Sequence, residues 1–85
     1  MSSREIVIQR PAEQLERDSV VQLIRTACEF KSAIAIRTEQ FQVNAKSMMG
    51  VLALGLEPGM KFRLEAEGGP DAEEALETIQ RWFEP

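Results

Sequence analysis

The chain contains no histidine and only one cysteine. The lack of histidine removes the commonest general base and the commonest metal ligand of proteins, and the acidic residues show no spacing typical of a metal site. One cysteine cannot form a disulfide within the chain, which suits a reducing compartment. We therefore expect neither a metal nor another cofactor, and we do not expect an enzyme.

Long apolar stretches are also lacking. No segment approaches the roughly 20 apolar residues of a transmembrane helix, and no apolar run follows Met1 as it would in a signal peptide. The net charge of −4 disfavours direct binding to nucleic acid. We expect a cytoplasmic protein whose partners are other proteins.

What the chain does have is the balanced composition of a globular protein. Its 85 residues are 44% hydrophobic and 28% charged, which argues against disorder. Repeats, linkers and low-complexity tracts are not found in the sequence. We therefore expect a single domain over residues 1–85.

Alternation of apolar and polar residues predicts the strands of a sheet. The clearest strand spans residues 60–67, where every second side chain is apolar and those between are charged. Such a period indicates that one face of the sheet packs against other parts of the protein and the other face contacts solvent. Three shorter stretches, at residues 4–9, 33–37 and 41–43, show the same alternation.

Two amphipathic helices are predicted to cover that sheet. The first is expected to begin at Val20, with Asp18 or Ser19 as its cap. The second opens at Pro70, a residue that the first turn of a helix tolerates. The economical arrangement is an α+β open-faced β-sandwich, with the helices on one face of a four-stranded, mainly antiparallel sheet.

A short third helix is predicted between these elements. Asn44 or Ser47 can cap its start, and Gly55 suits the position just past its end. A helix of barely two turns is unstable alone in water and cannot bury every face. Its apolar residues either fill the core, as methionine often does, or stay partly exposed for a partner. These residues include Met48, Met49 and Leu52.

The same stretch resembles a known family. Residues 43–55 read V-N-A-K-S-M-M-G-V-L-A-L-G, and they resemble the regulatory-serine region of HPr, the small phosphocarrier of the bacterial sugar phosphotransferase system. That region typically reads V-N-x-K-S-I/M-M-G-V/L-M/L-x-L-G. The resemblance covers about residues 4–83 and is poorest over residues 9–19. It implies the HPr fold, which has the order of elements predicted above.

The chain departs from the family at the phosphorylated histidine. In HPr proteins a loop that reads G-I-H-A-R-P carries it, and the resemblance places Glu16, Asp18 and Ser19 at the positions of the histidine, arginine and proline. A carboxylate can in principle form an acyl phosphate. Here Asp18 would repel the incoming dianion, with only Arg17 to offset it. We expect no phosphocarrier activity through this site.

Ser47 matches the regulatory serine, which an ATP-dependent HPr kinase phosphorylates in many Gram-positive bacteria. A phosphate there would meet free backbone N–H groups at a helix start, with Lys46 as a neighbouring cation. The alternative is that Ser47 only caps its helix. Three apolar residues align with the patch by which HPr proteins contact enzyme I, sugar permease domains and a catabolite-control repressor. With Lys46, the predicted partner surface comprises Met48, Met49 and Leu52.

Three functions remain open. The favoured one is a regulatory adaptor switched at Ser47, similar in logic to the catabolite-repression HPr proteins that lack the histidine and keep the serine. The second is an interaction module that needs no phosphorylation, and the least favoured is a carrier that uses Glu16. The expected partners are an HPr kinase, a transcriptional regulator or phosphotransferase-system components. Direct binding to nucleic acid or to a membrane is not expected.

Overall fold

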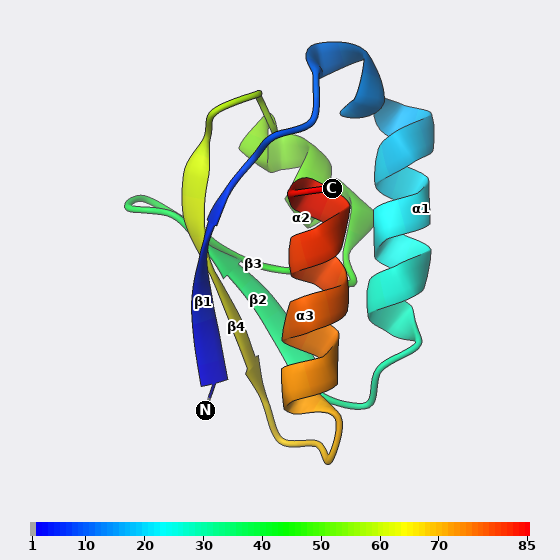
Figure 1. The fold of residues 1–85 in the computed structure, drawn as a ribbon, viewed down its shortest axis with the longest axis vertical. Coiled ribbons are helices and arrows are strands. Elements are labelled where there is room, and N and C mark those ends of the chain that lie inside the picture. Colours follow the sequence, from blue (N-terminus) through cyan, green and yellow to red (C-terminus); the bar gives the residue numbers. More distant parts are fainter. Residues whose placement is uncertain (1) are drawn as a thin grey trace.

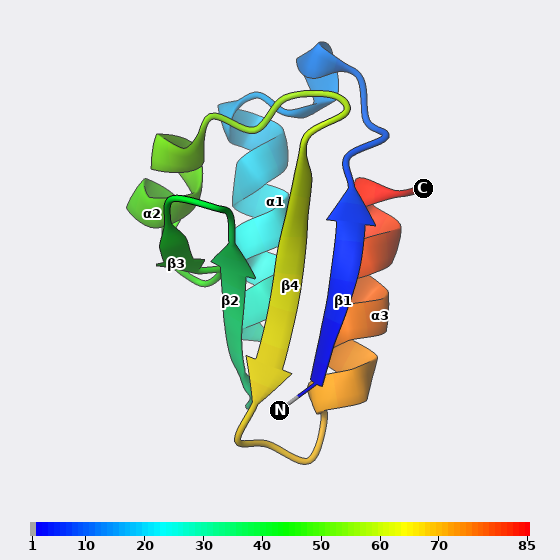
Figure 2. The same ribbon diagram turned by 90° about the vertical axis from the view of Figure 1, so that its left-hand side faces the viewer.

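The sheet has the strand order β1–β4–β2–β3, and every neighbouring pair is antiparallel (Figure 2). The computed structural model describes residues 2–85, so Met1 of the expected domain lies outside the described residues. All four predicted strands are present; the first lies two residues earlier and the third one residue later than predicted. The strands are β1 (Ser2–Val7), β2 (Ala33–Arg37), β3 (Gln42–Asn44) and β4 (Lys61–Glu67).

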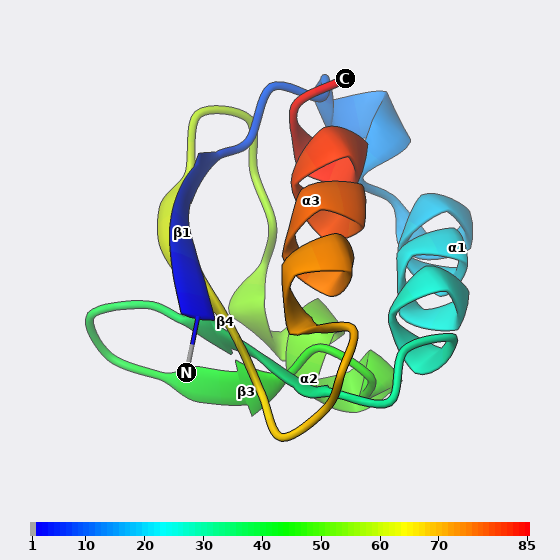
Figure 3. The same ribbon diagram turned by 60° about the horizontal axis from the view of Figure 1, so that its bottom comes forward.

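The α-helices lie on one side of this sheet and leave its other face open (Figures 1 and 3). This arrangement confirms the predicted α+β open-faced sandwich. Within residues 2–85 the helices are the 3₁₀ helix η1 (Ala12–Gln14) and the α-helices α1 (Arg17–Cys28), α2 (Met48–Leu54) and α3 (Ala72–Phe83).

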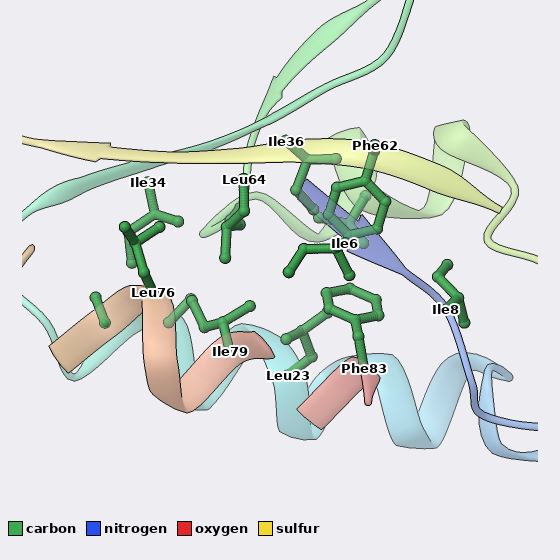
Figure 4. Packing of buried hydrophobic residues seen from close by; sticks show 14 of the residues in the cluster. Ile6, Ile8, Leu23, Ile34, Ile36, Phe62, Leu64, Leu76, Ile79 and Phe83 are labelled. Carbon is green, nitrogen blue, oxygen red and sulfur yellow. The ribbon is translucent and has the colours of Figure 1, made fainter. Parts of the chain in front are cut away.

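The hydrophobic core fills the space between the sheet and the helices (Figure 4). Phe62 of β4 meets Phe83 of α3 edge to face, with ring centroids 4.9 Å apart. Full burial of an aliphatic or aromatic side chain contributes about 1.5–3 kcal/mol, so the core is the main source of stability. Further buried side chains labelled in Figure 4 are Ile6, Ile8, Leu23, Ile34, Ile36, Leu64, Leu76 and Ile79.

Helix α1 begins at Arg17, three residues before the predicted start. Neither predicted cap is used, because Glu16 is the N-cap residue and its side chain makes no capping hydrogen bond. Its carbonyl accepts the first helical bond from the Val20 N–H at 3.0 Å. The preceding Leu15 is only 9% exposed and belongs to the core cluster. Packing of Leu15 and backbone bonding therefore set this helix start, without a side-chain cap.

Helix α3 begins at Ala72, two residues later than predicted, with Asp71 as its N-cap. The Asp71 carboxylate does not cap the helix; it accepts hydrogen bonds from the Lys31 N–H at 2.8 Å and from the Ser32 hydroxyl at 2.7 Å. Gly69 lies so close that a Cβ there would be 2.6 Å from the Ser32 oxygen. These contacts tie the α1–β2 loop to the turn before α3.

This junction makes the stability of the fold depend on pH. The backbone N–H of Lys31, followed by the Ser32 hydroxyl, holds the pKa of the Asp71 carboxyl below its ordinary value. An Asp in an unfolded chain has a pKa of about 4, so on acidification the unfolded state takes up this proton first. The stabilisation is therefore complete above about pH 4 and is lost as the pH falls through the lowered folded pKa.

We expect Asp71→Asn to lower the free energy of unfolding at neutral pH and to flatten its decline on acidification. Denaturant unfolding followed by circular dichroism at a series of pH values measures both effects. Glu74→Gln is the matched control, because Glu74 is an exposed acid of α3 without an ion pair among residues 2–85. An Asp71→Asn variant with an unchanged pH profile would show that this carboxylate does not contribute.

Candidate functional site

Ser47 is the cap of helix α2, and Asn44 shapes the turn that leads into it. The Ser47 hydroxyl oxygen accepts a hydrogen bond from the Gly50 N–H at 3.2 Å. The Asn44 side-chain oxygen accepts one from the Lys46 N–H at 2.8 Å. The helix ends at Gly55, whose φ of 66° is a left-handed conformation that glycine adopts without strain. Of the two predicted caps, Ser47 is therefore the one used.

Lys46 is held by the end of helix α1. Its Nζ donates a hydrogen bond to the Phe30 carbonyl oxygen at 2.7 Å, just past the last turn of that helix. Unpaired carbonyl groups and the negative end of the helix dipole favour a cation at this place. The two residues are 16 positions apart, so no local spacing in the sequence signals the contact. Lys46 therefore connects the turn before Ser47 to α1.

The apolar residues of α2 divide between the core and the surface. Met49 is 82% exposed and Leu52, one turn further on, is 40% exposed, whereas Val51 is fully buried. Met48 is half-buried and packs against the core. As expected of a two-turn helix, α2 does not hide all of its apolar side chains. The exposed apolar part of the predicted partner surface consists of Met49 and Leu52.

Glu16 is exposed at the N-terminus of α1, and Arg17 and Asp18 beside it are exposed as well. No ion pair among residues 2–85 involves any of these three side chains. The position thus holds an accessible carboxylate with an acidic neighbour and no cation bound to it. Such surroundings do not favour the approach of a phosphoryl dianion.

Glu16 and Ser47 are separate sites. Glu16 precedes the first turn of α1, whereas Lys46, next to Ser47, reaches Phe30 beyond the last turn. The 12 residues of α1 span roughly 18 Å at 1.5 Å per residue. The Lys46 side chain is therefore anchored at the end of α1 opposite to Glu16.

Among residues 2–85, no three cysteine, aspartate or glutamate side chains come together as a metal ion would require. None of the helices in the same range has the length and apolar character needed to span a membrane. Residues 16–18 and 46–52 hold the functional residues that the sequence predicts.

Comparisons with known proteins agree with this fold. The family model described as "PTS HPr component phosphorylation site" matches residues 2–85. The phosphocarrier protein HPr of Lysinibacillus sphaericus is 43% identical over 58 residues, a segment that covers 68% of this chain and 65% of that protein.

Solved structures extend the similarity over nearly the whole chain. The crystal structure of HPr-C-His from Thermoanaerobacter tengcongensis has a TM-score of 0.89 and 33% identity, covering 99% of this chain and 92% of that one. The crystal structure of Crh, a catabolite-repression protein of Bacillus subtilis described as an intertwined dimer, has a TM-score of 0.71 and 26% identity, covering 93% and 84%. The chain therefore belongs to the HPr family, although its sequence contains no histidine.

Proposed function

We propose that this protein is an HPr-like regulatory adaptor, a single domain over residues 1–85 that acts by binding protein partners and is switched by phosphorylation of Ser47. The observation that carries the proposal is the position of Ser47. Its partly exposed side chain starts α2, the helix that also presents Met49 and Leu52. A modification at Ser47 would thus lie on the element that carries the exposed apolar side chains.

The start of α2 is suited to a phosphate. The first N–H groups of a helix have no acceptor within it, and the dipole favours negative charge there. The first turn of α2 contains no acidic residue that would repel a phosphate. Charge-assisted hydrogen bonds from these N–H groups would therefore stabilise the modified helix.

The proposed partners bind through the predicted partner surface. Met49 and Leu52 would supply the apolar contact, Met48 supports them from the core side, and Lys46 adds a cation at the edge. Proteins of the HPr family interact with components of the phosphotransferase system, and the Crh neighbour is named as a catabolite-repression protein. We therefore propose an HPr kinase, a transcriptional regulator or phosphotransferase-system components as partners, in the cytoplasm.

The second candidate is an interaction module that needs no phosphorylation. It is favoured by the hydrogen bonds already made at the start of α2. The Ser47 hydroxyl is bonded to the Gly50 N–H, and the Lys46 ammonium is bonded to the Phe30 carbonyl. The helix is thus capped without a phosphate. A carrier that uses Glu16 has the weakest support, because no cation is bound to that carboxylate within residues 2–85.

Treatment with an HPr kinase and ATP, followed by peptide mass spectrometry, tests the proposal. We expect one phosphate on Ser47 and none on a Ser47→Ala control. A histidine-containing HPr protein with the regulatory serine, treated in parallel, verifies that the kinase is active. An active kinase that leaves Ser47 unmodified would reduce the residue to a helix cap and favour the second candidate.

A further inference from the structure

A second exposed apolar surface lies at the turn between β2 and β3, away from the predicted partner surface. Phe41 follows this turn and is 61% exposed. Its side chain borders a hollow of about 330 Å³ whose apolar lining includes Leu54 of α2 and Met60, the residue before β4. Glu39 and Lys61 also line this hollow. We call these five residues the hairpin surface.

The exposure of Phe41 does not result from a loosely held loop. Its N–H donates a hydrogen bond to the Thr38 hydroxyl oxygen at 3.0 Å, and its carbonyl oxygen accepts one from the Thr38 N–H at 2.8 Å. Both backbone groups of Phe41 are therefore fixed across the turn. An aromatic side chain on a fixed backbone loses little conformational entropy when it is buried by a partner.

The hairpin surface also carries two exposed charges of opposite sign. Neither Glu39 nor Lys61 takes part in an ion pair within residues 2–85. A two-fold interface places the same patch on both subunits, so that a residue and its counterpart exchange contacts across the axis. An acid and a base at one rim can therefore neutralise each other between two identical copies.

We propose that the hairpin surface binds a second copy of this chain in a two-fold dimer. The Phe41 ring of each copy packs against the hollow of the other, and Glu39 of each copy faces the partner's Lys61. The surface is self-complementary in two respects. It holds an exposed ring and an apolar hollow that can receive it, and it carries one acidic and one basic side chain. Stable interfaces bury about 1,200–2,000 Å² in total, and a patch of five residues is smaller, so the dimer is weak and depends on concentration.

Dimer formation leaves the predicted partner surface accessible. Leu54 is about 200° around the helix from Leu52, and it lines the hollow whereas Leu52 does not. The dimer therefore presents two copies of Met49 and Leu52. Two linked copies of a binding surface raise the apparent affinity for a partner with two matching sites.

Sedimentation velocity over a wide range of protein concentration tests the apolar part of the proposal. We expect a monomer–dimer equilibrium that Phe41→Ser weakens at least about tenfold, as truncation of an aromatic anchor does. Met49→Ser is the matched control, because it removes an even more exposed apolar side chain from the other flank of α2 and should leave the dimer unchanged. Circular dichroism verifies that both variants fold.

Charge exchange tests the orientation of the two copies. Glu39→Lys and Lys61→Glu should each weaken the dimer several-fold by placing like charges against each other, and the double variant should restore it. A chain that stays monomeric at millimolar concentration would overturn the proposal. A dimer that is insensitive to Phe41→Ser, or that the double charge exchange fails to restore, would overturn it as well. None of these measurements depends on Ser47 or on a kinase.

Discussion

Incubation with phosphoenolpyruvate and enzyme I is expected to leave this protein unlabelled. The chain contains no histidine, so no imidazole can attack the phosphoryl group. The residue at the corresponding position, Glu16, is an exposed carboxylate with acidic Asp18 two residues away. An acyl phosphate there would have to form against the repulsion of Asp18. Intact-mass spectrometry after the reaction measures the result directly.

Restoring the family's residues should restore the activity. We expect the double variant Glu16→His, Asp18→Arg to gain an acid-labile phosphoryl group, because the imidazole becomes the nucleophile and the guanidinium attracts the dianion at a helix start. The single variant Asp18→Arg is the control, since it supplies the cation without the nucleophile and should stay unlabelled. A hydroxylamine-labile label on Glu16 of the unmodified protein would contradict the prediction and revive the carrier function.

Most of the fold could be predicted from the sequence because its strands have a clear period. In β4, Phe62, Leu64 and Ala66 are buried and alternate with exposed Lys61 and Arg63, as the pattern requires. Glu65 departs from the predicted solvent-exposed face: it is only 8% exposed and pairs with Arg37 at 3.2 Å. An apolar sheet face and two helices with one apolar stripe each can pack together in only a few ways. The local pattern also predicted a short helix that could not bury all of its apolar side chains. The exposure of Met49 and Leu52 confirms this prediction.

Contacts between distant segments could not be predicted in this way. The sequence gives no reason to pair Lys46 with the Phe30 carbonyl, or Asp71 with the loop at Ser32, because nothing local links them. Side-chain preferences for helix caps also failed at Glu16, where only the backbone makes the capping bond. Packing of the assembled elements decides such details, and a single sequence shows it only indirectly.

Phosphorylation of Ser47 is expected to change the affinity for a protein partner far more than the stability of the fold. A phosphate at the start of α2 gains about 0.3–1 kcal/mol from the helix dipole, which raises the melting temperature of a domain of this size by about 1–8 °C. The same phosphate adds nearly two negative charges to the helix that exposes Met49 and Leu52. A coupling of this kind typically changes an affinity by roughly 5- to 150-fold.

Calorimetric titration of a phosphorylated and an unmodified sample into a candidate regulator separates the two effects. Ser47→Ala removes the cap and should lower the stability by about 1 kcal/mol, yet it should bind the partner as the unmodified protein does. Ser47→Asp should imitate the phosphate weakly, since it carries one charge and lacks the reach. Leu52→Ala should weaken binding in both phosphorylation states, because that side chain is part of the contact itself. Equal affinities of the phosphorylated and unmodified samples, with Leu52→Ala still weakening both, would assign the surface to an adaptor without a switch.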